Sequence, residues 1–458
     1  MTKAPARAKP SAANAAATST ALDVARVRQH FPALAIEQDG RPVVFFDNPA
    51  GTQVPQACID GIVHYLTTAN ANIKGAFLTS QRTDALLTEV HAAMADFLNA
   101  SDPREIAFGP NMTTLTFALS RALGRNLRPG DEIVVTTLDH DANIAPWLAL
   151  AEDRGAVVRF ADIDPVTCTL DMADVRAKIT KRTKIVAVGY ASNASGTIND
   201  VAKVVRWAHE VGAYSFIDAV HYGPHGPIDV QALKCDFFVC SSYKFFSPHL
   251  GILYGRLPLL ESLRAYKVRP ASDEPPGKWE VGTQNHECLA GLLGTLTYLA
   301  TIGRDHLGHY AARFPGMTGR RLQLHAAMAV IQEYERTLSA RMLDGLAQIP
   351  GVRIYGLTDP EDLSRRVPTF ALTIDGFTPR QIAEALGERG IFTWDGNYYA
   401  LALLEHLGLE QSGGMLRIGL VHYNTIEEID RLMATLREIV VPNRGARERK
   451  KRATPVGR

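Results

Sequence analysis

The sequence has no long apolar run, almost no excess of charge and no paired cysteines. No stretch reaches the roughly 20 uninterrupted apolar residues of a membrane-spanning helix, so we expect no contact with a membrane. The formal net charge is +1, which gives no general attraction to nucleic acid. The five cysteines lack CxxC spacing, which argues against a metal site and against a disulfide framework. We therefore expect a cytoplasmic protein without a bound metal.

The two ends of the chain differ in composition from the rest. Residues 1–22 are rich in Ala, Ser, Thr and Pro and contain no acid, which predicts a disordered arm. This arm lacks the apolar centre of a secretory signal, and a transit peptide is the remaining alternative for it. Residues 442–458 include the run Arg447–Arg452, which predicts a basic, disordered, solvated tail.

Between the two ends, apolar strand patterns alternate with helical patterns. With 458 residues and 46% hydrophobic content, the chain can bury more than one core. The alternation predicts an α/β protein with a parallel sheet covered by helices on both faces. The expected strands are Glu105–Gly109, Glu132–Leu138, Val157–Ala161, Lys184–Tyr190, Tyr214–Asp218, Phe237–Cys240 and Gly251–Tyr254. The expected helices include Thr113–Gly124, Asn143–Arg154, Val201–Val211 and Leu289–Ile302.

A smaller unit is expected after the turn-like region Gly316–Arg321. Its expected strands and helices are Val352–Tyr355, Thr369–Ile374, Pro379–Arg389, Met415–Val421 and Ile426–Ile439. We therefore divide the chain into an N-terminal segment at 23–45 that packs with the small domain, a large domain at 46–318 and a small C-terminal domain at 319–441.

Lys244 directly follows the apolar run Phe237–Cys240, beside Ser241 and Tyr243. A second apolar run ends in Asp218, and His221 comes shortly after it. Pyridoxal phosphate needs a lysine for its Schiff base, an acid for its ring nitrogen and hydroxyls for its phosphate. A surface lysine and a helix-capping aspartate would be the ordinary alternative.

Three further expected strands end in polar side chains. Thr113 and Thr114 open a helix that could hold a phosphate, His140 could stack on a ring, and Asn193 lies in a polar turn. Each residue alone could be a helix cap or a turn former. Ligands of open parallel sheets gather at the carboxyl ends of strands, so the coincidence of these residues favours one cofactor site.

Five motifs in this order resemble class V aminotransferase-fold enzymes, most closely the cysteine desulfurases and their desulfurase-like relatives. They are Asp139–Trp147, Ile217–His221, Ser241–Lys244, Glu280–Asn285 and Arg417 with Tyr423–Glu428. The resemblance covers about Phe31 to Val441. It implies a fold type I pyridoxal-phosphate enzyme with a mostly parallel seven-stranded sheet, a smaller α+β C-terminal domain and a homodimer with active sites at the subunit interface.

The resemblance assigns each cofactor contact to a residue of this chain. Lys244 carries the internal aldimine, Asp218 pairs with the ring nitrogen, His140 stacks on the ring and His221 binds the 3-hydroxyl. The implied phosphate ligands are Thr113, Thr114, Ser241 and Tyr243, with Thr283 supplied to the site of the partner subunit.

The resemblance also implies the substrate contacts. Asn193, beside the cofactor, and Arg417 hold an α-carboxylate, while Asn48 lies in a substrate-side loop. The chain departs from the desulfurases in the loop that delivers their cysteine, because Tyr399 stands at the cysteine position and Trp394 at that of an arginine. A phenol cannot accept sulfane sulfur, but it can donate a proton. Tyr399 is therefore a candidate catalytic residue beside Lys244 and His140, and Trp394 is a candidate substrate contact; plain aromatic packing remains the alternative for this loop.

These residues lead us to expect a lyase or transferase that acts on a small amino acid. Deprotonation at Cα would be followed by β-elimination with C–S cleavage, or by epimerisation. The alternatives are a genuine cysteine desulfurase that uses an unrecognised thiol and a scaffold without catalysis. The substrate cannot be read from the sequence, because the cofactor residues serve all these reactions.

Overall fold

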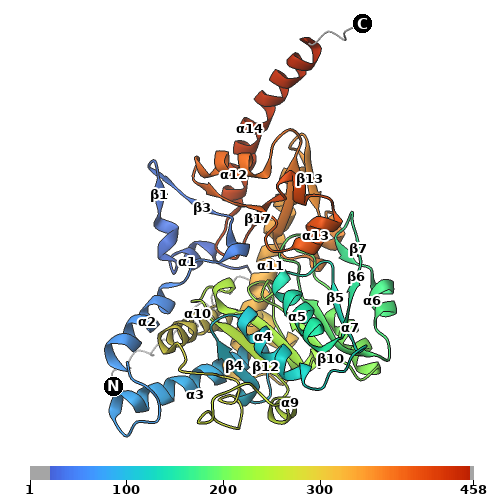
Figure 1. Cartoon of the computed structure of the whole chain (residues 1–458). Helices are drawn as coiled ribbons and strands as arrows, with labels where there is room; N and C mark the ends of the chain where they lie inside the picture. The colour runs from blue at the N-terminus through green and yellow to red at the C-terminus, as the bar shows by residue number, and fades with distance from the viewer. Residues whose placement is uncertain (1–20, 454–458) are drawn as a thin grey trace, which may run out of the picture.

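A seven-stranded sheet forms the centre of the larger part of the molecule, which we call the large unit (Figure 1). The computed structural model describes residues 21–453, with side chains through residue 441. The strand order is β4-β12-β11-β10-β9-β5-β6, and all strands are parallel except β12. The strands are β4 (Ile106–Gly109), β5 (Glu132–Thr136), β6 (Val157–Ala161), β9 (Thr183–Gly189), β10 (Tyr214–Asp218), β11 (Phe237–Ser241) and β12 (Gly251–Gly255). The predicted α/β fold with a mostly parallel seven-stranded sheet is confirmed.

Helices cover both faces of this sheet. Along β11, Phe238 and Cys240 join the core on one face, and Phe237 and Val239 join the core on the other. This two-sided burial explains why the strands are continuous apolar runs. The covering helices are α3 (Leu78–Leu98), α7 (Val201–Glu210), α10 (His286–Tyr310) and α11 (Gly319–Ala347) on the first face, and α4 (Met112–Gly124) and α5 (Ala145–Arg154) on the second.

A four-stranded antiparallel sheet forms the small unit, with the order β13-β14-β17-β16. Its elements are β13 (Val352–Tyr355), β14 (Thr369–Ile374), α12 (Pro379–Gly387), β16 (Trp394–Gly396), β17 (Met415–Gly419) and α14 (Ile426–Ala453). Helix α11 belongs to both units, because Leu324 packs in the core of the large unit and Leu338 in that of the small unit. The change from one core to the other thus falls within α11, between Ile331 and Leu338, and a domain boundary at residue 319 stays a proposal.

The N-terminal segment contacts the small unit. Strand β3 (Val44–Phe45) pairs in parallel with β15 (Ile391–Phe392). Arg28 donates to the backbone oxygen of Tyr423 and forms an ion pair of 2.8 Å with Glu428. These contacts support the proposal that residues 23–45 pack with the small domain.

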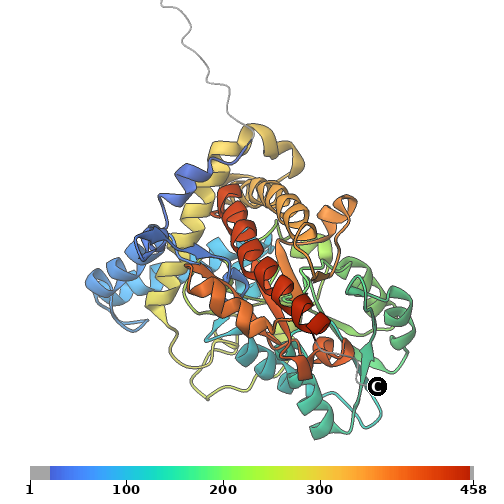
Figure 2. The same cartoon turned by 90° about the horizontal axis from the view of Figure 1, so that it is seen from above.

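Helix α14 leaves the body of the molecule and ends at Ala453 (Figure 1). Seen from above, it lies over the centre of the molecule (Figure 2). Residues 442–453 are therefore helical, where composition alone predicted disorder, because Arg, Glu, Lys and Ala are also strong helix formers. The remainder of the expected tail at 454–458 and most of the expected arm, residues 1–20, lie outside the described residues. Among residues 21–453, no helix is both long and apolar enough to cross a bilayer.

Candidate active site

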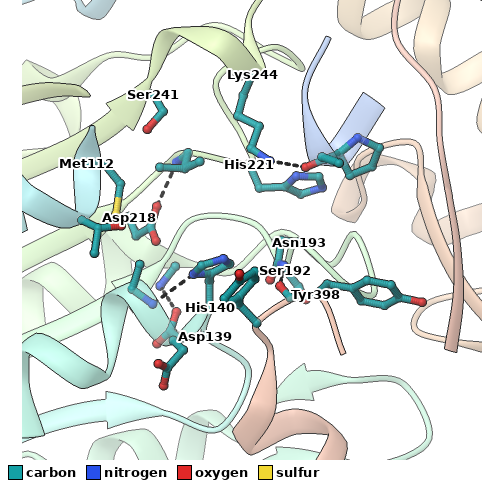
Figure 3. A pocket seen from close by; sticks show the side chains of 18 of the residues that line it. Met112, Asp139, His140, Ser192, Asn193, Asp218, His221, Ser241, Lys244 and Tyr398 are labelled. Atoms are coloured by element: carbon teal, nitrogen blue, oxygen red, sulfur yellow. Dashed lines mark hydrogen bonds between the residues drawn. The ribbon is translucent and has the colours of Figure 1, made fainter. Parts of the chain in front are cut away.

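A cavity of about 780 Å³ lies between the carboxyl ends of the parallel strands and the small unit. Its volume is in the range of small-molecule sites. Figure 3 shows side chains from β10, β11 and the turns after β5 and β9 around one space. The residues predicted for the site that line this cavity are Thr113, His140, Asn193, Asp218, His221, Ser241, Tyr243, Lys244, Trp394, Tyr399 and Arg417.

Lys244 ends the short helix Ser242–Lys244 that directly follows β11. Its Nζ donates a hydrogen bond to the backbone oxygen of Pro49 and lies 4.7 Å from the centre of the Tyr243 ring (Figure 3). Burial, together with the nearby charge of Arg417, lowers the pKa of Lys244 to about 7. A large fraction of this amine is therefore neutral and nucleophilic near neutral pH.

Asp218 ends β10 and faces the cavity with one free carboxylate oxygen. Its Oδ1 accepts a hydrogen bond of 2.9 Å from the amide of Val220, and Oδ2 has no hydrogen-bond partner among the described residues. Burial raises the pKa of Asp218 to about 6. A cationic ring nitrogen would restore the charge partner that this buried carboxylate lacks.

His140 presents a neutral imidazole to the cavity. Its Nδ1 accepts a hydrogen bond of 3.0 Å from the amide of Ala142, which leaves the hydrogen on Nε2. Burial lowers the pKa of His140 to about 4, helped by the charges of Lys244 and Arg417. The ring stacks on Tyr399, with the ring centres 5.5 Å apart and the planes inclined by 25°.

Asp139, whose role the sequence did not reveal, connects the ends of β5 and β9 by hydrogen bonds next to His140. Its Oδ1 accepts a hydrogen bond of 2.5 Å from the amide of Gly189, and its Oδ2 accepts one of 2.8 Å from Thr136 Oγ1. A Cβ atom on Gly189 would lie only 2.6 Å from Oδ1. Burial raises the pKa of Asp139 to about 7. The position of Asp139 in the same motif as His140 was the only signal of its importance.

Arg417 places a guanidinium group at the side of the cavity, and no carboxylate among the described residues forms an ion pair with it. The residue is only 4% exposed, and its Nη1 donates to the backbone oxygen of Asn193 at 2.9 Å. Its Nε has no hydrogen-bond partner in residues 21–441. Burial lowers the pKa of Arg417 to about 10, which keeps it charged at neutral pH. The charge of Asp47 acts on this guanidinium without forming an ion pair with it, so the free donor of Arg417 favours a carboxylate ligand.

Backbone contacts hold the loop that carries Tyr398 and Tyr399 against the large unit. The backbone oxygen of Tyr398 accepts a hydrogen bond of 2.9 Å from Asn193 Nδ2, and the backbone oxygen of Tyr399 accepts one of 2.7 Å from the amide of Asp141. Both tyrosines have positive φ, at 56° and 59°, which non-glycine residues rarely adopt. The Tyr399 side chain is 70% exposed and Trp394 is 49% exposed, so both lie at the mouth of the cavity.

Three predicted site residues do not line the cavity of this chain. Asn48 was expected to face the substrate, but its buried amide donates to the backbone oxygens of Phe45 and Gly419 at 2.8 Å and 2.9 Å. Thr114 was expected to bind phosphate, but it does not line the cavity, and its hydroxyl donates at 2.9 Å to Oδ1 of Asn111, which does. Both side chains are used in local hydrogen bonds. Thr283 is exposed and lies away from the cavity of its own chain, so its role in a partner's site remains a proposal.

The residues around the cavity fit pyridoxal phosphate. Lys244 would hold its aldehyde carbon, Asp218 its ring nitrogen and His140 one face of its ring. The hydroxyls of Thr113, Ser241 and Tyr243 would hold its phosphate. The buried Asn193 Oδ1 has no hydrogen-bond partner within the described part of the chain, which is a further sign that a polar ligand belongs here.

The chain matches the aminotransferase class-V family over residues 44–324 and 319–432. It is 33% identical over 438 residues to a cysteine desulfurase from Synechococcus elongatus, which covers 92% of this chain and 64% of that protein. The chain thus spans less than two thirds of that relative. It is 31% identical over 431 residues to a cysteine desulfurase from Pectobacterium atrosepticum, covering 91% of this chain and 98% of that protein.

A solved structure shows the same fold. The apo structure of a cysteine desulfurase from Thermococcus onnurineus is 27% identical, with a TM-score of 0.79, and the match covers 91% of this chain and 98% of that one. The chain therefore belongs to the aminotransferase class-V family, as a cysteine desulfurase-like enzyme of fold type I whose cofactor is pyridoxal 5'-phosphate.

Proposed function

We propose that this enzyme cleaves a carbon–sulfur bond of an amino acid by β-elimination, without a persulfide on the protein. The observation that carries the proposal is the composition of the cavity wall, which contains Tyr399 and none of the five cysteines. Curated relatives are named cysteine desulfurase, which supports a sulfur-bearing amino acid as substrate.

The residues of the cavity have the properties that such a reaction requires. When bound, pyridoxal phosphate supplies an electron sink for the bond broken at Cα. Arg417 would hold the substrate carboxylate, and the neutral amine of Lys244 would take the proton from Cα. Asp218 would keep the ring nitrogen protonated. Tyr399, at the cavity mouth, would donate a proton to the sulfur that leaves Cβ.

The positions of the thiols disfavour a persulfide route. Cys58, Cys168, Cys235 and Cys240 are buried, and burial raises the pKa of each thiol, to about 11 for Cys58 and about 12 for Cys168. Cys288 is partly exposed, but burial also raises its pKa, and it lies on α10 away from the cavity. Little thiolate would therefore be present to attack sulfur.

The assembly and the compartment form part of the same proposal. An exposed Thr283 outside its own cavity is what a phosphate ligand for a second subunit requires, and this supports a homodimer. Five unpaired cysteines are compatible with a reducing cytoplasm.

The test compares the parent enzyme with a variant in which all five cysteines are replaced by Ser or Ala. Sulfide, pyruvate, ammonia, alanine and inverted stereochemistry are measured on a panel of sulfur-bearing amino acids. We expect the cysteine-free variant to keep its activity within about threefold and, with cysteine, to form sulfide, pyruvate and ammonia in equal amounts. A cofactor-loaded variant without turnover, together with alanine and a trapped persulfide on the parent, would restore the desulfurase reading.

The role of Tyr399 is tested with Tyr399→Phe. We expect a loss of about tenfold or more in turnover, because general acid catalysis contributes at least that much. Tyr266→Phe is the matched control, since Tyr266 is exposed and does not line the cavity. Unchanged turnover in Tyr399→Phe would show that its ring serves only to pack against His140. Inverted stereochemistry without pyruvate would instead identify an epimerase.

A further inference from the structure

Thr369 of the small unit contacts the histidine that faces the cofactor position. It is the first residue of β14 and is fully buried. Its Oγ1 lies 2.9 Å from His221 Nε2, although the two residues are 148 positions apart in the sequence. His221 lines the cavity after β10, whereas Thr369 does not line it.

The direction of this hydrogen bond follows from the surroundings of the hydroxyl. Among the described residues, Thr369 Oγ1 has no hydrogen-bond partner other than His221. A buried hydroxyl must place its hydrogen on an acceptor, so it donates to Nε2.

The imidazole of His221 can accept this hydrogen because the ring is neutral. Burial lowers the pKa of His221 well below its ordinary value. The charged or titratable groups that face it, His225, Arg417, Lys244 and His140, act in the same direction. A neutral imidazole carries one hydrogen, which must then sit on Nδ1.

We propose that Thr369 is a positioning residue that fixes His221 as the Nδ1–H tautomer, so that His221 offers a hydrogen-bond donor to the phenolate oxygen of the cofactor. Without the hydroxyl of Thr369, His221 could adopt either tautomer. The Nε2–H tautomer would present an acceptor, and no donor, to the phenolate oxygen of the cofactor. Thr369 therefore acts through His221 and does not touch the cofactor.

The same segment of the small unit also fixes other parts of the site. The amide of Val367 donates to the oxygen of Gly196 at 2.8 Å, in the turn that carries Asn193. Thr369 pairs with Gly419 on β17, two residues from Arg417. A Cβ atom on Gly196 would lie 2.5 Å from the backbone oxygen of Thr369, so the two segments pack closely. The small unit thus sets the tautomer of His221 together with the positions of Asn193 and Arg417.

The first measurement needs no substitution. Nitrogen chemical shifts of ¹⁵N-histidine-labelled protein, with and without cofactor, distinguish the two tautomers, and His221→Gln assigns the signal. We expect protonated Nδ1 and unprotonated Nε2 for His221 in both states near pH 8. A hydrogen on Nε2 would overturn the proposal.

The second measurement compares Thr369→Val, which has the same shape without the hydroxyl, with Thr369→Ser, which keeps it. The readout is the pH midpoint of the absorbance band of the bound cofactor. A donor to the phenolate oxygen favours the deprotonated form, so its loss should raise the midpoint by about half a unit to one unit, the size of one lost hydrogen bond. We expect this rise in Thr369→Val, and the parent value in Thr369→Ser and in the control Thr373→Val on the same strand.

An unchanged midpoint and an unchanged tautomer in Thr369→Val would overturn the proposal. A rise of equal size in Thr373→Val would show that β14 acts through packing alone and would overturn it as well. If Thr369→Val does not fold, the tautomer of the parent protein still decides the question, because a hydrogen on Nε2 of His221 overturns the proposal. Both readouts are independent of the reaction that the enzyme catalyses.

Discussion

At the scale of single residues, the cavity holds ionisable groups whose burial changes their protonation. Lys244 and Arg417 are two cations in one site, and Asp218 and Asp139 are two buried acids close enough to influence each other. Burial favours the uncharged form of each group, so the pKa values of the lysine and the two acids lie within a narrow range near neutrality. Small changes in pH should therefore alter the site strongly.

The pKa of Lys244 predicts how the apoprotein takes up its cofactor. A lysine becomes nucleophilic above its pKa, so a value of about 7 implies that the uptake rate rises between about pH 6 and pH 8. Stopped-flow absorbance with pyridoxal measures this rate without a titrating phosphate. In Arg417→Met the midpoint should move upward, because one cause of the lowered pKa is removed. A parent rate that still climbs between pH 9 and pH 10 would contradict the prediction.

The residues that the sequence led us to expect at the cavity, and that line it, are those that end or directly follow a buried strand. Lys244, Asp218 and His140 each follow an apolar run, and the ends of parallel strands meet at one edge of the sheet. Asn48 could not be placed in this way, because it lies in a short 3₁₀ turn and its amide turns inward. Thr369 could not be identified from the sequence, because its contact with His221 depends on how the small unit packs against the large unit.

At the scale of elements, strands were easier to predict than their directions. Strands β6 and β10 have the predicted bounds, and β11 is one residue longer than predicted. The antiparallel direction of β12 could not be read from its apolar residues, which look alike in both directions. The start of α11 falls within the predicted boundary region, but its periodicity is weak because residues 324–331 are all buried.

The loop that carries Tyr399 should exchange its amide hydrogens slowly while Asn193 holds it. In Asn193→Ala, the hydrogen bond to the Tyr398 oxygen is lost, and exchange in residues 397–404 should become about threefold to tenfold faster. Hydrogen-exchange mass spectrometry measures this rate. Asn199→Ala is the matched control, because its buried amide donates to Gly189 and not to the loop. Equal acceleration in both variants would mean that the loop is not held by Asn193.

At the scale of the whole molecule, the phosphate ligands that we propose for the site of one chain are all uncharged. The candidate phosphate contacts on its own walls are the uncharged side chains of Thr113, Ser241 and Tyr243. The hydroxyl of Thr283 from a second subunit would add a further uncharged donor to this set, and this gives the proposed dimer a role in binding the cofactor.

Mixed dimers test whether Thr283 acts in the partner's site. Lys244→Ala and Thr283→Ala chains are combined, and cofactor retention is followed by absorbance. If Thr283 acts across the interface, one of the two sites in each mixed dimer has both native residues and should regain the affinity of the parent. Each variant alone is the control. A mixture that binds no better than Thr283→Ala alone would show that Thr283 serves its own chain.

The antiparallel β12 has a consequence for the order in which the site is made. Because β11 and β12 form a hairpin, the turn that carries Lys244 depends on neighbours close in sequence, and Ser242 bonds to Leu250 across it. Arg417 follows only near the end of the chain. Local contacts form early, and chains fold from the N-terminus during synthesis. The lysine, its acid and the stacking histidine are therefore expected to be in place on a nascent chain before the carboxylate site exists, so that cofactor capture can precede the ability to bind substrate.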